Sequence, residues 1–409
     1  MARGPHAIPG LDDINVAGKR VLLRVDFNVP LDSQGAVRDD SRLRASLPTI
    51  RDLLERGAAV IVATHLGRPG GKPDPALSTL TLVPPLEQLL HRPVAWAPDC
   101  VGPEVERRVA DLQPGQVLLL ENLRFHPEEE ANDPGFAGQL AGLGDAYVND
   151  AFAASHRAHA STEAVAGLLP AAAGRLMAEE VSQLGALLAS PRRPLLAIIG
   201  GSKLSTKLGI LQHLIEKVET LCLGGAMAAT FLKAAGLEVG RSLVEDDFLD
   251  SALDLVAQAT RRGAALELPA DVVVAPAADA GPDEVRTKAV QELDPGDMIL
   301  DLGPRTVERW QALIATAGTV VWNGPLGLYE VPRFAKATEQ LARALAASPA
   351  RSVTGGGDLL AALQRLGLEG SLSHVSTGGG ATLEFLEGKT LPGVAALEHS
   401  GRDSSRDRG

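Results

Sequence analysis

The sequence predicts an α/β protein with two domains, each built on a parallel β-sheet covered by helices. Three observations favour this fold class. The chain has 409 residues, more than a single hydrophobic core usually organises. Short apolar runs alternate with longer amphipathic runs, as strands alternate with helices around parallel sheets. This alternation restarts after residues 170–194, so we expect the domain boundary there.

The first half contains two well-marked helices between short apolar strands. Residues 41–57 are predicted to be a helix, because Ser41 is a favoured N-cap, apolar residues recur at helical spacing, and Gly57 can end it. Residues 103–115 form a second predicted helix, with a proline in the first turn. The predicted strand-and-loop segments are residues 19–30, 58–69, 116–127 and 144–152.

Residues 174–194 are predicted to form one long helix closed by Pro191, and this helix could connect the two halves. The second half then repeats the pattern, with strands expected in "RRPLLAIIGGSK", "VETLCLGG", "ADVVVAP", "GDMILDLGP", "GTVVWNGP" and "ARSVTGGG". We expect a domain over residues 1–173, a connecting helix over 174–190 and a second domain over 191–390. The polar end, residues 398–409, is expected to be disordered.

Composition excludes several function classes. The net charge of −12 argues against general binding to nucleic acids or membrane surfaces, and the aromatic content of 3% is low for base stacking. No apolar run reaches the roughly 20 residues of a membrane helix. Cys100 and Cys222 suggest no disulfide framework, and the first residues lack an apolar signal segment. These features favour a cytoplasmic protein.

Basic and polar side chains follow successive strands of the first half. They are Asp26, Asn28, His65, Arg68, Asn122, Arg124, His156, Arg157 and His159, with Arg42 at a helix start. Ligands of open α/β sheets bind at the carboxyl ends of strands, and clustered guanidinium groups suit a phosphate or a phosphate with a carboxylate. Taken singly, each arginine could be a surface ion pair and each Asp or Asn a turn cap. His156 and His159 suggest zinc only weakly, because no third ligand is nearby.

The strand ends of the second half are rich in glycine, which lets the backbone approach a nucleotide closely. Lys203 and Lys207 are spaced to share one face of the helix expected to open there. Asp358 follows three glycines at a helix start, where it could meet Mg²⁺ on a polyphosphate or simply cap the helix. The G-x-x-x-x-G-K-[ST] motif, the dinucleotide-binding G-x-G-x-x-G pattern and the protein-kinase H-R-D signature are absent.

Together these motifs resemble the phosphoglycerate kinase family. In the family's order, the sequence carries "RVDFNVP", "THLGRP", "ENLRFHPEEE", "YVNDAF…HRAH", "GGSK…K", "VWNGPLG", "GGGD" and "HVSTGGGATLE". The resemblance covers about residues 11–397 and implies two Rossmann-like domains joined by a hinge helix. It implies reversible, Mg²⁺-dependent phosphoryl transfer from 1,3-bisphosphoglycerate to ADP after domain closure, without a covalent intermediate. It also implies a monomer.

The resemblance assigns residues to both ligands. The triose site would comprise Asp26, Phe27, Asn28, Arg42, His65, Leu66, Gly67, Arg68, Arg124 and Arg157. The nucleotide would meet Lys207, Asn323, Glu330, Gly356, Gly357, Asp358 and Leu359, with Glu330 on the ribose and Asp358 linked to Mg²⁺. The transferring group would meet Arg42, Lys203, Lys207, Gly378, Gly379 and Gly380. Residues 391–397 would return to the first domain.

Some positions depart from the family pattern. Leu359 stands where many members carry Thr or Ser, which removes a hydroxyl contact to phosphate but keeps the backbone amide. Ser202 and Ala226 replace a common Ala and Gly. Two other functions stay open from the residues: a non-enzymatic sensor of triose phosphate, and an acyl-phosphate kinase of the acetate type. The transfer residues disfavour the sensor, and the arginine cluster disfavours the acetate-type kinase.

Overall fold

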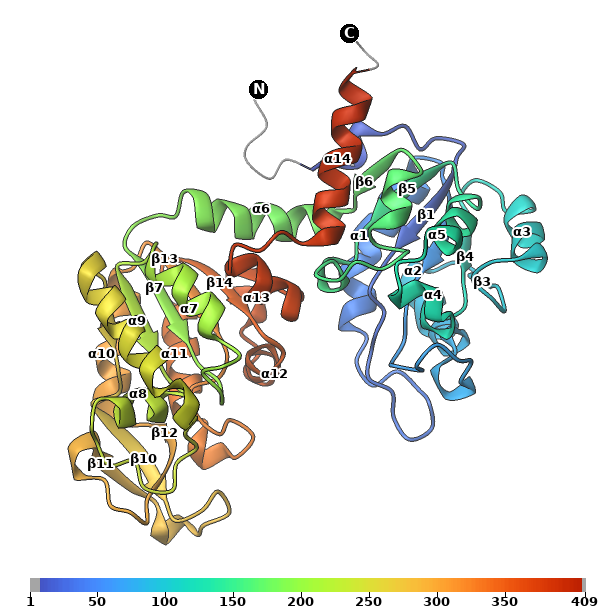
Figure 1. The fold of residues 1–409 in the computed structure, drawn as a ribbon. Coiled ribbons are helices and arrows are strands. Elements are labelled where there is room, and N and C mark those ends of the chain that lie inside the picture. The colour runs from blue at the N-terminus through green and yellow to red at the C-terminus, as the bar shows by residue number, and fades with distance from the viewer. Residues whose placement is uncertain (1–7, 407–409) are drawn as a thin grey trace. The chain divides into compact units, whose positions relative to one another are not determined.

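The computed structural model describes residues 8–406 (Figure 1). The described chain divides into two units, one formed by residues 8–182 together with residues 390–406, the other by residues 183–389. The division falls inside helix α6 (Arg175–Ala189). The chain therefore passes once through the second unit and comes back to the first.

The first unit is organised by a six-stranded sheet, in the order β3-β4-β2-β1-β5-β6, and all its strand pairs are parallel. The strands are β1 (Arg20–Arg24), β2 (Ala59–Ala63), β3 (Ala95–Trp96), β4 (Val117–Leu119), β5 (Ala146–Asn149) and β6 (Ala171–Ala173). Strands β1, β2 and β5 are buried on both faces, which explains their continuous apolar sequences.

The helices of the first unit are α1 (Ser41–Glu55), α2 (Val83–Leu90), α3 (Pro103–Ala110), α4 (Pro127–Glu130) and α5 (Pro134–Ala141). The apolar residues of α1, including Leu43, Leu47 and Ile50, pack with Val21 and Val60 of the central strands in the main core. Burying this face at helical spacing holds α1 against the sheet. The packing fixes the position of Arg42 in the first turn of α1.

The C-terminal helix α14 (Pro392–Arg406) belongs to the first unit and packs against β6 and the short 3₁₀ helix η6 (Ala164–Gly167). Val394 and Leu397 are buried, and the Gly393 amide donates to the Ser155 carbonyl at 3.0 Å. The helix continues to Arg406, so residues 398–406 are helical within the segment that the sequence predicts to be disordered. The buried first turns anchor the helix, and its polar residues continue it. The last part of that expected tail, residues 407–409, lies outside the described residues.

The second unit has a six-stranded parallel sheet in the order β15-β14-β13-β7-β8-β9. Its strands are β7 (Leu195–Ile199), β8 (Thr220–Leu223), β9 (Ala265–Glu267), β13 (Thr319–Asn323), β14 (Arg351–Gly355) and β15 (His374–Val375). The helices are α7 (Leu208–Ile215), α8 (Ala228–Ala234), α9 (Leu249–Arg262), α10 (Pro304–Thr316), α11 (Lys336–Ala346), α12 (Gly357–Leu366) and α13 (Gly380–Leu386). Trp310 and Trp322 are fully buried in its core.

Two strands expected in a parallel sheet lie elsewhere. Strands β10 (Asp271–Ala275), β11 (Arg286–Ala289) and β12 (Met298–Leu302) form a separate antiparallel sheet. No α-helix separates these strands, and parallel pairing needs a long crossover connection. Among the described residues, no helix has the length and apolar character needed to cross a lipid bilayer.

Candidate active site

Asp26 lies at the centre of a charged cluster at the carboxyl end of β1. Its carboxylate forms an ion pair with Arg42 of α1 and lies 4.0 Å from Nε2 of His65, which follows β2. The Asn28 amide donates to Asp26 Oδ1 at 3.0 Å. Burial alone would raise the pKa of Asp26, but the nearby positive charges and this amide hold it below its ordinary value. Asp26 is therefore ionised at neutral pH and orients Arg42.

His65 is buried and contacts a second arginine, Arg24 of β1. Arg24 Nη2 lies 3.1 Å from His65 Nδ1, and Arg24 Nε donates to Ser161 Oγ at 2.8 Å. Ser161 in turn donates through Oγ to Glu129 at 2.6 Å. Burial, together with the positive charges of Arg24, Arg124 and Arg42, lowers the pKa of His65 well below its usual value. His65 is neutral at pH 7.

Asn122 ties together the loops that follow β2 and β4. Its Oδ1 accepts the amides of Leu66 at 3.2 Å and Arg124 at 3.0 Å, and its Nδ2 donates to the Leu66 carbonyl at 2.7 Å. Arg124 Nη1 donates to the Gly67 carbonyl at 2.9 Å, and the Gly67 amide donates to Asn28 Oδ1 at 2.8 Å. These bonds hold Arg124 beside the loop that carries His65.

Two further arginines of the predicted cluster are exposed. Neither Arg68 nor Arg157 has a side-chain hydrogen bond or ion pair with another described residue, so both guanidinium groups are free to take an anion. Arg157 is close enough to Arg124 to act on its pKa, which burial lowers. Phe27 and Leu66 are buried and contribute packing and backbone rather than side-chain contacts.

The sequence hint of a histidine pair is not supported by the side-chain contacts. His156 Nδ1 lies 2.9 Å from the Ala153 carbonyl oxygen. His159 is buried, and burial with the nearby arginines lowers its pKa to about 4. Neither residue belongs to a group of three metal-ligating side chains in the part of the chain that the structure describes.

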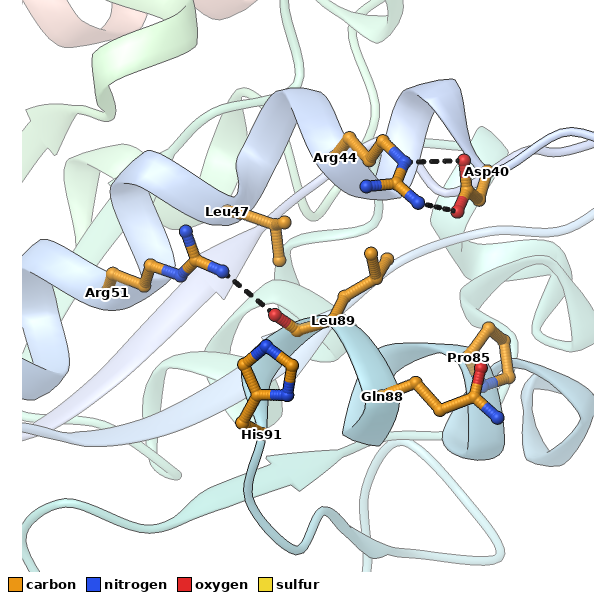
Figure 2. A pocket seen from close by; sticks show the side chains of 8 residues that line it. All are labelled: Asp40, Arg44, Leu47, Arg51, Pro85, Gln88, Leu89 and His91. Carbon is orange, nitrogen blue, oxygen red and sulfur yellow. Dashed lines mark hydrogen bonds and ion pairs between the residues drawn. The ribbon is translucent and has the colours of Figure 1, made fainter.

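A cavity of about 440 Å³ lies elsewhere in the first unit, between α1 and α2. Figure 2 shows Arg44 paired with Asp40 and Arg51 donating to the Leu89 carbonyl. None of the predicted triose or nucleotide residues lines this cavity. Its arginines are therefore separate from the Asp26 cluster.

In the second unit, Asn323 ends the central strand β13 and meets Lys207 from the loop after β7. Lys207 Nζ donates to Asn323 Oδ1 at 2.5 Å. Burial lowers the pKa of Lys207, whereas the carboxylates of Asp358 and Glu387 act in the opposite direction. Asn323 Nδ2 is buried and has no hydrogen-bond partner among the described residues. A buried N–H group without an acceptor destabilises the protein, and an acceptor on a bound ligand would remove that cost.

The expectation that Lys203 and Lys207 share a helix face is wrong. Helix α7 begins only at Leu208, and the segment before it is a turn held by Glu245. The Glu245 carboxylate accepts the Ser205 amide at 2.9 Å and the Ser205 hydroxyl at 2.6 Å. Lys203 is consequently exposed, and Lys207 is mostly buried.

The loop after β14 starts helix α12 with an uncapped amide end. Gly356 has a φ of 101° and is the N-cap residue, with no side-chain cap bond. A Cβ at Gly356 would lie 3.3 Å from Asn323 Nδ2, so glycine keeps the space around that donor open. Asp358 is exposed in the first turn, where the Tyr329 hydroxyl lies 3.5 Å from its Oδ1. Asp358 therefore does not cap the helix.

Leu359 and Glu330 lie in different environments. The Leu359 side chain is fully buried in the core with Trp322, so only its backbone can face a ligand at the start of α12. Glu330 is exposed near Tyr329.

In the "STGGG" turn after β15, one backbone amide already has a hydrogen-bond acceptor within the protein. The Gly378 amide donates to Ser376 Oγ at 3.2 Å, and Ser376 Oγ lies 2.5 Å from Thr382 Oγ1. The Gly378 amide is thus not free for an anion. Gly379, with a φ of 54°, and Gly380 stand at the start of α13, where the first amides have no acceptor within the helix.

The family profile described as phosphoglycerate kinase matches residues 11–389. The chain belongs to the phosphoglycerate kinase family. It is 54% identical over 389 residues to the phosphoglycerate kinase of Moorella thermoacetica, covering 95% of this chain and 98% of that one. It is 51% identical over 393 residues to that of Chlorobium phaeovibrioides, again covering 95% and 98%.

Solved structures of phosphoglycerate kinases share the fold. The enzyme of Coxiella burnetii superimposes with a TM-score of 0.87 at 40% identity, covering 96% of this chain and 99% of that chain. The enzyme of Pyrococcus horikoshii gives a TM-score of 0.84 at 31% identity, with 97% and 100% coverage. The helix-covered parallel sheets predicted from the sequence are those of the phosphoglycerate kinase fold. Sequence reasoning missed Arg24, Ser161 and Glu129 beneath this family's charged cluster.

Proposed function

We propose that this chain transfers a phosphoryl group reversibly between 1,3-bisphosphoglycerate and ADP, giving 3-phosphoglycerate and ATP in glycolysis and gluconeogenesis. The main support for the proposal is that this member of the family contains both the Asp26 cluster and the Lys207–Asn323 pair. The first offers guanidinium groups to a phosphorylated acid. The second offers donors to a polyphosphate.

The triose ligand would bind through Arg42, Arg68, Arg124 and Arg157. Two of these, Arg68 and Arg157, are exposed and unpaired in the described chain, which suits them to a phosphate dianion. Asp26 and Asn28 can bond the hydroxyl of the acid. A neutral His65 can donate from Nε2 while Arg24 occupies Nδ1.

The nucleotide would bind at the carboxyl edge of β13 and β14. The orphaned Nδ2 of Asn323, the Lys207 ammonium and the amides of the first turn of α12 are suitable donors for phosphate oxygens. Glu330 would bond the ribose. Asp358 fits a magnesium ion shared with the phosphates, because it is an exposed carboxylate with no capping role. When bound, Mg²⁺ supplies charge neutralisation of the polyphosphate.

The transfer needs no general base or covalent intermediate, because the carboxylate that attacks in one direction and leaves in the other is ionised throughout. Positioning and charge stabilisation therefore carry the catalysis. Arg42 and Lys207 would stabilise the equatorial oxygens of the transferring group. The amides of Gly379 and Gly380 would assist, and Lys203 would reach the group from its exposed turn. The Gly378 amide would first have to leave Ser376.

Direct transfer requires the two substrates to meet, and water must be excluded from an acyl phosphate. We therefore infer that the units close around both substrates. Small-angle scattering should show a smaller radius of gyration with 3-phosphoglycerate and a non-hydrolysable ATP analogue together than with either alone. Identical profiles would argue against closure. By its resemblance to the family, we also expect a cytoplasmic monomer.

A comparison of acceptors tests the proposed reaction against the acetate-type kinase. With MgATP as donor, 3-phosphoglycerate and acetate are supplied at equal concentrations, and ADP formation is followed. We expect transfer to 3-phosphoglycerate and none to acetate, because acetate has no phosphate for the arginine cluster. Equal transfer to both acids would contradict the proposed triose site.

A further inference from the structure

Three side chains with metal-binding donors meet at the far end of the first unit's sheet. Asp99 and Cys100 lie in the loop after β3, and His126 lies in the loop after β4. One ligand atom from each lies within 4.8 Å of the others. Within residues 8–406 this is the one group of three or more histidine, cysteine, aspartate or glutamate side chains gathered in this way.

The donors are held in place before any ligand arrives. His126 Nε2 lies 2.6 Å from Asp99 Oδ1, and the His126 ring stacks on Phe136 with centroids 4.9 Å apart. The Cys100 amide donates to Asp99 Oδ1 at 2.6 Å. The Cys100 thiol is fully buried and donates to the Glu121 carbonyl at 2.9 Å. Because β3 and β4 are parallel neighbours, both loops leave the same sheet edge.

The charge around the cluster favours a cation. Asp99 supplies one carboxylate, and Glu129 and Glu121 are close enough to act on Cys100. A divalent cation at this point would offset the negative charge of these carboxylates.

We propose that Asp99, Cys100 and His126 form a binding site for a borderline divalent cation of the zinc type. A sulfur, a nitrogen and an oxygen ligand fit Zn²⁺, with the Glu121 carbonyl oxygen or water in the fourth position. On binding, the cation replaces the thiol proton, which passes to the solvent, and a metal–thiolate bond forms. Mg²⁺ would bind this site poorly, because Mg²⁺ prefers oxygen ligands.

An ion at this position would cross-link the loops after β3 and β4 through its coordination bonds. The loop after β4 also carries Asn122 and Arg124, which contact Leu66 and Gly67. The cation should therefore stabilise the first unit. This consequence depends neither on the nucleotide nor on turnover.

Cobalt(II) titration tests the site, since a cobalt–thiolate bond gives a near-ultraviolet charge-transfer absorption that nitrogen and oxygen ligands do not. The parent protein should develop this band with one equivalent of Co²⁺, and Zn²⁺ should abolish it. Cys100→Ser should lose the band. Cys222→Ser is the matched control, because Cys222 is equally buried in the second unit and belongs to no such group of three ligating side chains among the described residues; it should keep the band.

Two further variants keep the test decisive if Cys100→Ser folds poorly. Asp99→Asn and His126→Asn should each weaken Co²⁺ binding by about tenfold or more, whereas His91→Asn, an exposed histidine in the same unit, should not. A parent protein without the band at saturating Co²⁺ would overturn the proposal. So would a band that survives in folded Cys100→Ser.

Discussion

Arg24 Nη2 lies 3.1 Å from Nδ1 of His65, and both side chains are buried beneath the charged cluster of the first unit. A guanidinium can only donate, so Nδ1 must accept. The proton of the imidazole is therefore on Nε2, the nitrogen that faces Asp26 at 4.0 Å. One buried arginine thus sets both the tautomer and the charge of a residue that we place in the triose site.

We expect His65 to stay neutral, with its proton on Nε2, from pH 6 to pH 8. Burial and the charges of Arg24, Arg124 and Arg42 lower its pKa. Long-range ¹H–¹⁵N spectra of the imidazoles report both the tautomer and the titration. Replacing Arg24 with Met should raise the pKa of His65, since it removes a positive charge. A His65 that titrates in the parent near the free value of about 6.5 would refute this.

Arg42→Ala should lower kcat at least tenfold, a loss of about 1.4 kcal/mol or more in barrier stabilisation. The reason is that Arg42 is oriented by Asp26 toward the ligand edge. Arg44→Ala is the control: Arg44 lies on the same helix, is exposed and pairs with Asp40. Steady-state kinetics of the two folded variants should differ. An unchanged kcat in Arg42→Ala would remove Arg42 from the transition state.

Leu359→Thr should destabilise the second unit by roughly 1–3 kcal/mol without tightening nucleotide binding. The Leu359 side chain is fully buried with Trp322, so a hydroxyl there enters the core rather than the ligand edge. Denaturant unfolding and ADP titration measure the two effects. Leu360→Thr, at the neighbouring partly exposed position, should cost less. Tighter ADP binding by Leu359→Thr would show that the position does reach the phosphates.

Asp150 should make the first unit less stable as the pH rises from about 4 to 7. Its Oδ1 accepts the amides of Leu176 and Met177 at the start of α6, and these bonds, together with the Thr49 side chain, oppose the effect of burial on its pKa. Burial raises its pKa from 3.8 to about 7. The native state therefore holds a proton that the unfolded chain releases near pH 4, and this advantage disappears as the pH passes 7.

Asp150→Asn isolates this effect, because the amide keeps the Oδ1 acceptor and cannot ionise. Relative to this variant, the parent should lose on the order of 4 kcal/mol between pH 4 and 7 and then level off. Urea midpoints at several pH values provide the comparison. Parallel pH profiles for the two proteins would mean that Asp150 ionises normally.

Much of the first unit's charged edge could be anticipated, because parallel strands bring their carboxyl ends to one side. The contacts of Asp26 with Arg42 and His65 agree with that reasoning. Arg24 could not be found in this way. It lies inside an apolar strand, and its partner Ser161 is 137 residues away. The one feature of the sequence that could have pointed to Arg24 is its charge within an otherwise apolar strand.

The second unit departed from prediction where distant contacts decide local structure. The spacing of Lys203 and Lys207 fits a helix, but Glu245, 40 residues beyond Ser205, holds that segment as a turn. Apolar runs identified β10 and β12 as strands. They did not indicate that the two strands pair antiparallel, because this pairing depends on the connection through β11. The helical course of residues 398–406 likewise continues the preceding turns of α14, which pack on β6 and η6.

The most direct test of the proposed function is phosphoryl transfer from ATP to 3-phosphoglycerate, followed through a coupled dehydrogenase with and without Mg²⁺. We predict turnover that requires both substrates and the metal. A folded protein that binds 3-phosphoglycerate and ADP but shows no turnover would contradict the account. That result would favour a triose-phosphate sensor built on the same fold.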